Sequence, residues 1–340
     1  MPVTIKQIAE RSGLSVPTVS QVLNNKGHRY RSETCKRVLK AVRELGYRPN
    51  SSARAIRMGR FNCVALLLST DPSKSFLPNE LLRGIHDGVA ERDYHMSLTV
   101  LPDQKLTDEG FVPKILRQWM ADGLLVNYHV ALPPRMVELI QEHGIPSVWI
   151  NTKQKSDCVY PDDFGASREA TEKLLGLGHK KIVYADFGLG LDEPPTHFSC
   201  ADRYDGYAHA MCAAGLEPRA IPVATALPFP ERAAFAAKIL SQPDRPTAIV
   251  TYSDTSAMPI IQGAASLGLQ FPRDLSVVTH YESLTALSGI GIATMVIPWH
   301  AVGHTAATML LEKIKDPTQV LAPRALPFAF EAGQTFGPPS

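Results

Sequence analysis

Hydrophobic residues recur with a helical period three times within the first 46 residues. The runs are short and are separated by glycine or by polar residues. The first two are joined by a turn of about three residues that contains Gly13, which is typical of a helix-turn-helix unit. The hydrophobic positions of the three expected helices are Ile5, Ile8 and Ala9; Val19, Val22 and Leu23; and Val38, Leu39, Val42 and Leu45.

Capping residues predict where these helices begin and end. Thr4 and Gln7 fit a capping box, in which each side chain accepts a backbone N–H of the other residue. Ser15 and Ser32 are suitable N-caps for the second and third helices. Gly46 is suited to the left-handed position that ends a helix. These signals predict an all-α helix-turn-helix domain over residues 1–46.

From residue 63 onward, short β-rich runs alternate with helical stretches. This alternation predicts an α/β body with parallel sheets covered by helices on both faces. The runs suffice for two doubly wound parallel-sheet subdomains, roughly 63–163 plus 293–325 and 164–292 plus 326–340. The expected strands are 63–69, 95–101, 122–126, 146–151, 181–187, 220–225, 247–253 and 275–280, and the expected helices are 79–93, 107–121, 134–143, 165–177, 203–215, 230–241 and 255–267.

Charge is distributed unevenly, although the formal net charge is only +2. Residues 1–60 contain 13 Lys and Arg but three acidic residues, so this segment carries +10 and the remainder −8. A basic segment on an acidic body favours contact with a polyanion such as nucleic acid. The alternative is a solvated basic surface that has no partner.

The composition excludes several classes of protein. The N-terminus lacks the pattern of a signal peptide, and the hydrophobic runs are too short to span a membrane. Five cysteines without a CxxC pair favour reduced thiols in a cytoplasmic protein. The HExxH, GxSxG, Walker A and GxGxxG motifs are absent, and the 11 histidines show no metal-binding spacing. We therefore expect no enzyme activity, metal, cofactor or membrane partner.

The second helix, in "SVPTVSQVLNN", has the residue types of a helix that enters the major groove. Val16 can contact a thymine methyl group, and Gln21 can pair with N6 and N7 of adenine. Pro17 places a short side chain in the first turn, which lets this end of the helix approach DNA closely. The alternatives are simple capping for Ser15 and Thr18 and an unengaged, solvated side chain for Gln21. The DNA-contacting residues expected in this domain are Thr4, Ser15, Val16, Pro17, Thr18, Ser20, Gln21 and Asn24.

Residues 47–62 are basic, contain no acidic residue and are too short to fold alone. They form a candidate hinge between the two domains. Asn50 can cap a short helix, and Arg54 would line one side of it. Ile56 can act as a wedge between base steps in the minor groove. The alternative for Ile56 is an exposed side chain without a role.

Six motifs together make the sequence similar to the LacI/GalR family of bacterial transcription regulators, over the whole chain. The resemblance implies a homodimer that binds a pseudo-palindromic DNA operator with its two heads, while paired hinge helices open the minor groove. The family usually has Leu where this chain has Ile56, and the loop "KGHRYRSET" is one residue longer than usual. The motifs are "VTIKQIAERSGLSVPTVSQVLNN", "RELGYRPNSSARAI", "GHKKIVY", "ADRYDGYAHAM", "PTAIVTYSDTSA" and "FPRDLSVV".

A ligand cleft is expected where the carboxyl ends of the strands of the two subdomains meet. Residues 63–340 would then form an effector-binding and dimerisation domain, with an architecture that also occurs in periplasmic sugar-binding proteins. Arg203 is expected at the start of a helix, and its alternative is a surface ion pair with Asp202 or Asp205. Trp299 is either a stacking platform or a core aromatic residue. The expected effector-binding residues are Phe76, Asn151, Ser199, Arg203, Ser253, Asp254, Tyr281 and Trp299; the family resemblance itself implies Asn151, Ser199, Arg203, Ser253 and Trp299.

Two departures from the family pattern concern the ligand. Asn151 and Tyr281 stand where the family often has acidic residues. A less acidic cleft predicts a ligand that is unusual for the family or negatively charged. The predicted function is a DNA-binding transcriptional regulator, a repressor switched by a sugar-like effector. The alternative is a sugar-binding sensor with no specific role on DNA.

Overall fold

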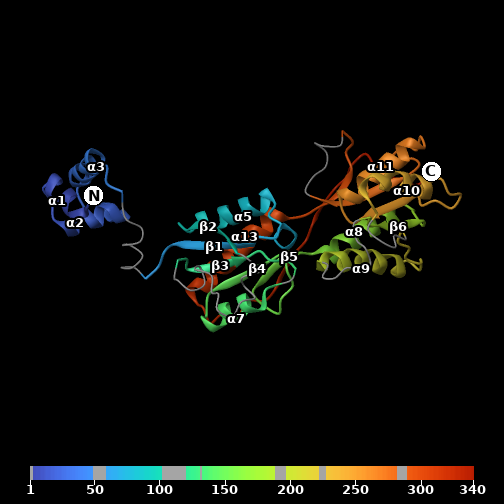
Figure 1. Ribbon diagram of the computed structural model, residues 1–340. Helices are drawn as coiled ribbons and strands as arrows, with labels where there is room; N and C mark the ends of the chain where they lie inside the picture. The colour runs from blue at the N-terminus through green and yellow to red at the C-terminus, as the bar shows by residue number, and fades with distance from the viewer. Residues whose placement is uncertain are drawn as a thin grey trace. The chain divides into compact units, whose positions relative to one another are not determined.

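The computed structural model describes residues 3–48, 59–101, 120–130, 132–187, 197–221, 227–281 and 289–340. The chain divides into two compact units, Met1–Phe61 and Asn62–Ser340. We refer to them as the head and the body and describe each separately (Figure 1).

The head contains three α-helices, α1 (Ile5–Ser12), α2 (Val16–Gln21) and α3 (Ser32–Leu45). A π-helical turn (Val22–Lys26) and a 3-10 turn (Gly27–Arg29) connect α2 to α3. The predicted capping box at Thr4 and Gln7, the Ser15 cap and the left-handed glycines that end α1 and α3 are confirmed. The core of the head contains Ile8, Ala9, Val19, Val22, Val38 and Ala41.

Two details of α3 differ from the prediction. Its N-cap is Arg31, whose backbone is extended, and Ser32 is the first helical residue; no side chain caps this end. Leu39 is 48% exposed, while Ala41 is buried. The inward face follows Val38 at intervals of three and four residues, and Leu39 lies about 100° away from Val38 around the helix.

The first sheet of the body has six strands in the order β10-β5-β4-β3-β1-β2, all paired in parallel. Side chains of β1 alternate between its faces, as a strand requires. Val64 and Leu66 pack with α5 and α13, whereas Ala65 and Leu67 pack with α7, so helices cover both faces (Figure 1). The elements are β1 (Cys63–Ser69), α5 (Asn79–Ala90), β2 (His95–Leu101), β3 (Gly123–Val126), α7 (Pro134–Glu142), β4 (Ser147–Ile150), β5 (Cys158–Pro161), α13 (Trp299–Lys315) and β10 (Arg324–Leu326), with a 3-10 turn at Pro72–Lys74.

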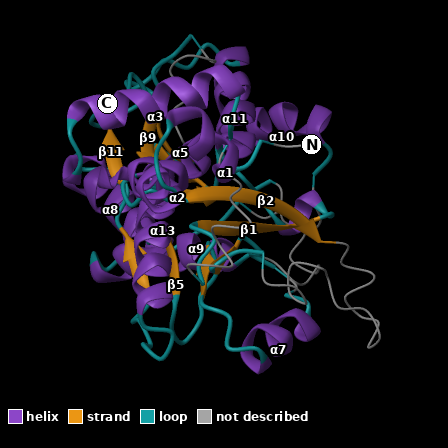
Figure 2. Ribbon diagram, turned by 90° about the vertical axis from the view of Figure 1, so that its left-hand side faces the viewer, coloured by secondary structure: helices purple, strands orange, loops and turns teal. Residues whose placement is uncertain are grey.

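The second sheet has five strands in the order β11-β9-β8-β7-β6. Four are parallel, and β11 is antiparallel to β9. Helices α8 and α9 pack on one face, and α10 and α11 pack on the other; Figure 2 shows the helices flanking the strands. The elements are α8 (Asp163–Gly176), β6 (Ile182–Ala185), α9 (Phe198–Ala213), α10 (Arg232–Leu240), β7 (Ala248–Thr251), α11 (Asp254–Ser266), β8 (Ser276–Tyr281), β9 (Ala293–Val296) and β11 (Ala329–Glu331), with a 3-10 turn at Phe229–Glu231.

The chain passes between the two sheets three times, after β5, β9 and β10. The predicted return to the first subdomain at residue 293 is therefore wrong, because β9 pairs with β8 and β11 of the second sheet. Helix α9 begins at Phe198, five residues before the predicted start, so Arg203 does not begin the helix. Of the predicted strand 220–225, only a bridge between Ala220 and Tyr184 is described. The predicted helix 107–121 lies largely outside the described residues.

Candidate functional site

A cavity of about 260 Å³ lies in the body between the two sheets. Its lining residues come from the carboxyl ends of β5 and β8, from segments that follow β1, β3, β4, β7 and β9, and from the N-terminal parts of α8, α9, α11 and α13. The eight residues predicted for the effector site all line this cavity. The other lining residues are His129, Pro161, Asp163, His197, Tyr252, His280 and Ile297.

Arg203 forms a buried ion pair with Asp163. Its Nε lies 2.7 Å from Oδ1 of Asp163, and Nη1 donates to the backbone carbonyl of Tyr252. Burial raises the pKa of Asp163, and the nearby guanidinium opposes that shift. The expected alternative, a surface ion pair with Asp202 or Asp205, is wrong, because Arg203 is only 6% exposed. Asp202 pairs with Lys153 instead.

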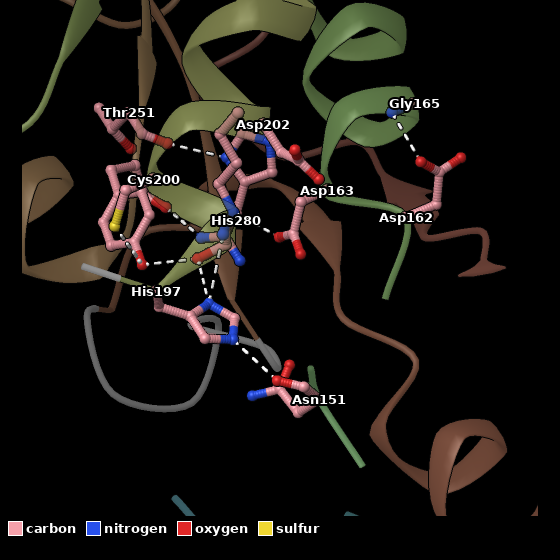
Figure 3. A network of polar contacts seen from close by, with 12 residues as sticks. Asn151, Asp162, Asp163, Gly165, His197, Cys200, Asp202, Thr251 and His280 are labelled. Atoms are coloured by element: carbon pink, nitrogen blue, oxygen red, sulfur yellow. Dashed lines mark hydrogen bonds and ion pairs between the residues drawn. The ribbon is translucent and has the colours of Figure 1, made fainter. Parts of the chain in front are cut away.

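A chain of hydrogen bonds fixes the side chains of Ser199 and His197 (Figure 3 labels His197 and Asn151). Nε2 of His197 lies 3.0 Å from the backbone carbonyl of Asn151, which can only accept, so Nε2 carries the proton. Nδ1 therefore accepts from the backbone N–H and the hydroxyl of Ser199. The Ser199 hydroxyl, at 2.9 Å, then accepts from Tyr252.

The backbone of Asn151 places its carbonyl for this contact. Asn151 has φ of 55°, in the left-handed region that Asn adopts more readily than most residues. It follows β4 directly, whereas His197 is the N-cap of α9. The hydrogen bond between them therefore joins the two subdomains across the cleft. The ion pair of Lys153 and Asp202 is a second such link.

The cleft histidines are neutral at pH 7. Burial lowers the pKa of His197 to about 4 and the pKa of His280 to about 3, and it also lowers the pKa of His129. His280 donates from Nδ1 to the carbonyl of Thr251 at 2.8 Å (Figure 3). His129 accepts the backbone N–H of Phe76 and donates to the carbonyl of Ser73.

Two aromatic residues form one wall of the cavity. The rings of Phe76 and Trp299 meet edge to face, with centroids 5.9 Å apart. Phe76 is 52% exposed, whereas Trp299 is 6% exposed and packs in the core of the first sheet. Trp299 is therefore a core residue at the start of α13 that also lines the cavity, and its stacking on a ligand stays a prediction.

The remaining predicted residues lie beside the second sheet. Ser253 is the N-cap of α11, and its hydroxyl lies 2.8 Å from that of Thr255. Asp254 is in the first turn of α11, and Tyr281 ends β8. Both line the cavity.

The head presents an exposed face at the start of α2. Val16 is 38% exposed, and Pro17 is also exposed. The hydroxyl of Ser15 accepts the backbone N–H of Thr18 and lies 2.8 Å from its hydroxyl, so the capping role of this pair is confirmed. The predicted hinge residues Asn50, Arg54 and Ile56 lie outside the described residues.

Three other predicted head residues are engaged within the head. The side chain of Asn24 donates to the carbonyl of Ser20 at 2.8 Å. Gln21 is exposed and accepts a hydrogen bond from the hydroxyl of Tyr30. The solvated, unengaged side chain considered for Gln21 is therefore not observed.

Sequence reasoning missed five polar residues of the cavity. A lone histidine or tyrosine carries no spacing signal. Tyr252 and His280 stand near the ends of the predicted strands 247–253 and 275–280, beside Ser253 and Tyr281, and that position offered a signal. Nothing local distinguishes the other three. The missed residues are His129, Asp163, His197, Tyr252 and His280.

Two other kinds of feature are absent from the described residues. No group of three or more His, Cys, Asp or Glu side chains there is arranged to hold a metal ion. No helix in the described part of the chain is long and apolar enough to cross a membrane.

A helix-turn-helix head on a two-sheet body with a cleft defines a class of ligand-responsive DNA-binding proteins. Comparison with known proteins agrees with this class. Residues 4–50 match the model for bacterial regulatory proteins of the lacI family, and residues 171–336 match the periplasmic binding protein-like domain.

Curated relatives align over nearly the whole chain. The HTH-type transcriptional regulator RegA of Clostridium saccharobutylicum is 29% identical, over 94% of this chain and 97% of the relative. The ribose operon repressor of Escherichia coli K12 is 29% identical, over 93% and 94%. A solved structure of the Lac repressor dimer bound to operator and the anti-inducer ONPF covers 98% of this chain and 99% of that chain, with TM-score 0.75 and 19% identity.

These matches agree in the head, in the body and in overall length. The chain belongs to the lacI family of bacterial regulatory proteins. It is accordingly a DNA-binding transcriptional regulator and not an enzyme.

Proposed function

We propose that this chain is a repressor that binds a pseudo-palindromic operator as a homodimer and is switched by a sugar-like effector in the cleft. The observation that carries the proposal is the cavity between the two sheets. It collects the eight residues predicted for the effector site in a chain that also has a helix-turn-helix head. A sugar-binding sensor without a role on DNA would not need the exposed polar face of α2.

The charges around the cavity favour a neutral effector. Arg203 is the one permanently charged basic residue among the described lining residues, and Asp163 compensates its charge. Asp254 adds a second carboxylate, and burial keeps three histidines neutral. An anionic ligand would therefore meet no uncompensated cation. This balance of charge disfavours the negatively charged ligand that was expected because Asn151 and Tyr281 stand where the family often has carboxylates.

The polar and aromatic groups of the cavity suit a hydroxyl-rich ligand. Side chains such as Asn151 and Ser253 can exchange hydrogen bonds with ring hydroxyls. The edge-to-face pair of Phe76 and Trp299 offers an apolar wall against which the C–H face of a sugar can pack. The ribose operon repressor among the relatives agrees with this class of effector.

Links across the cleft supply a mechanism for the switch. The hydrogen bond from His197 to Asn151 and the ion pair of Lys153 with Asp202 favour the present geometry of the two subdomains. An effector that binds one cleft geometry more tightly shifts the population toward that geometry. The effector and the operator then change each other's affinity by the same factor.

A second copy of the chain has a candidate contact surface at the edge strand β2. Leu98 is 50% exposed and Val100 is 48% exposed, and β2 is the last strand of the first sheet (Figure 2). Exposed hydrophobic side chains on an edge strand favour association. Burying them against a partner supports the homodimer that a pseudo-palindromic operator requires.

The test is an electrophoretic shift assay with operator duplexes selected from a randomised library. The full chain should bind selected duplexes with an affinity that falls steeply as salt increases. A fragment spanning 62–340 should not bind them. Retention of full-strength, salt-sensitive binding by that fragment would contradict the assignment of DNA binding to the head.

A further inference from the structure

The contact between Tyr30 and Gln21 lies on the face of the head that is proposed to contact bases. The Tyr30 hydroxyl donates to Oε1 of Gln21 across 2.9 Å. Gln21 is exposed at the C-terminal end of α2, while the ring of Tyr30 is partly buried and packs against the head core. The ring of Tyr30 is fixed by its packing against the head core, and its hydroxyl therefore restrains the exposed amide of Gln21.

The loop between α2 and α3 places Tyr30 next to Gln21. A π-helical turn (Val22–Lys26) follows α2 directly, and a 3-10 turn (Gly27–Arg29) leads to Tyr30. These two turns therefore bring Tyr30 back to the groove-facing helix.

The hydrogen bond fixes which atoms of Gln21 remain available. Because Tyr30 donates to Oε1, Oε1 retains one lone pair, and the N–H groups of Nε2 form no hydrogen bond with a described residue. A donor and an acceptor side by side in a fixed plane match N7 and N6–H of adenine in the major groove. The amide also loses less rotamer freedom on binding than an unrestrained Gln side chain would.

We propose that Tyr30 is a positioning residue that orients the amide of Gln21, and that the pair sets the preference for one base pair in each operator half-site. The inference rests on the proposed function, because it requires sequence-specific DNA binding by the head. Tyr30 acts through Gln21 rather than through a DNA contact of its own.

The experiment uses the full chain and the duplex that the wild-type protein selects from a randomised pseudo-palindromic library. Each half-site position is then changed to each other base, and the dissociation constants are measured for wild type, Tyr30→Phe, Gln21→Ala and the double variant. Tyr30→Phe keeps the ring in the head core and removes only the donor. Tyr204→Phe is the control, because Tyr204 belongs to α9 of the body, outside the head and the hinge, and its hydroxyl has no hydrogen-bond partner among the described residues.

The expected result is a loss of discrimination at a single half-site position. Tyr30→Phe should reduce discrimination there about three- to tenfold, the range expected for one hydrogen bond. Affinity for unrelated duplexes and the salt dependence should not change. In the double variant, the loss should equal that of Gln21→Ala alone, because Tyr30 acts only through Gln21.

Three results would overturn the inference. If Tyr30→Phe discriminates between bases as well as wild type does, the hydrogen bond from Tyr30 to Gln21 does not affect base preference. A uniform loss of affinity on all duplexes would make Tyr30 a backbone contact instead. Additive losses in the double variant would make the two residues independent. If the wild-type protein selects no sequence at all, the proposed function fails, and this inference fails with it.

Discussion

Arg203 and Asp163 form an ion pair that is almost fully removed from solvent, with exposed side-chain fractions of 8% and 1%. The pair joins α9 to the first residue of α8, and the guanidinium also holds the carbonyl that follows β7. Arg203 therefore supports the base of the cleft as well as lining it.

Removing one partner of this pair should destabilise the body. Arg203→Ala leaves the Asp163 carboxylate buried without its cation, so we expect the free energy of unfolding to fall by about 3–5 kcal/mol. Asp163→Ala should cost a similar amount. The double variant should lose clearly less than the sum, because it leaves neither charge uncompensated. Urea unfolding of the full chain measures all three, and additive losses would contradict this role for the pair.

Two helices of the first subdomain approach too closely for a side chain. A Cβ on Gly84 of α5 would overlap the backbone carbonyl of His300 in α13. Gly84→Ala must push the helices apart, so we expect a loss of about 1–3 kcal/mol in the free energy of unfolding. Gly176→Ala is the matched control, because a Cβ there has open space at the end of α8. A control that is as unstable as Gly84→Ala would refute the steric explanation.

Buried histidines should make stability depend on pH. Burial lowers the pKa of His197 to about 4 and of His280 to about 3, whereas in the unfolded chain both titrate near 6.5. Below pH 6.5 the unfolded state therefore binds more protons than the folded state. Stability should be fully present above pH 6.5 and should fall as pH decreases toward 4. The slope is up to about 1.4 kcal/mol per pH unit for each group.

Urea unfolding at about pH 7.5, 6.5 and 5.5 measures this dependence. His197→Gln should make the slope shallower by the contribution of one group. Substitution of the exposed His143 by Gln should leave the slope unchanged. Stability that is constant from about pH 7.5 to 5.5 would contradict the burial of these two imidazoles in their neutral form.

Gln21→Ala should change the sequence preference of the head more than its general affinity for DNA. We expect a loss of about 1–3 kcal/mol on the selected operator, confined to one base pair in each half-site. Non-specific binding depends on phosphate contacts and should persist. A fluorescence anisotropy titration against matched single-base variants measures both. Equal losses on every duplex would show that Gln21 contacts phosphates rather than bases.

The sequence predicted most of the elements because their signals are local. Capping pairs such as Thr4 with Gln7, the glycines that end helices, and β-rich runs such as 63–69 depend on neighbouring residues. Errors arose where the deciding contact is distant in the chain. Strand β9 belongs to the second sheet because it pairs with β8 and β11. The sequence of a strand does not reveal which other strands it pairs with.

The candidate site was predictable in its location but not in its internal contacts. Residues at strand ends, including Ser253 and Tyr281, were placed correctly beside one cavity. The ion pair of Asp163 with Arg203 could not be predicted, because 40 residues separate them and only the packing of α8 against α9 brings them together. The role of His197 depends on the left-handed backbone of Asn151, which follows from the fold and not from a motif.

The central claim is that occupancy of the cleft controls DNA binding by the same chain. Operator affinity of the full chain should be measured with a panel of neutral sugars, sugar acids and sugar phosphates, for wild type and Phe76→Ala. Phe76 is half exposed on a loop, so its truncation should remove part of the cleft wall without unfolding the body.

We expect at least one neutral sugar to change the operator dissociation constant of the wild type by about tenfold, within the usual range of allosteric coupling. Phe76→Ala should bind the free operator normally but need about tenfold more sugar for the same response. An operator affinity that no member of the panel changes, or an identical sugar response in Phe76→Ala, would contradict the account.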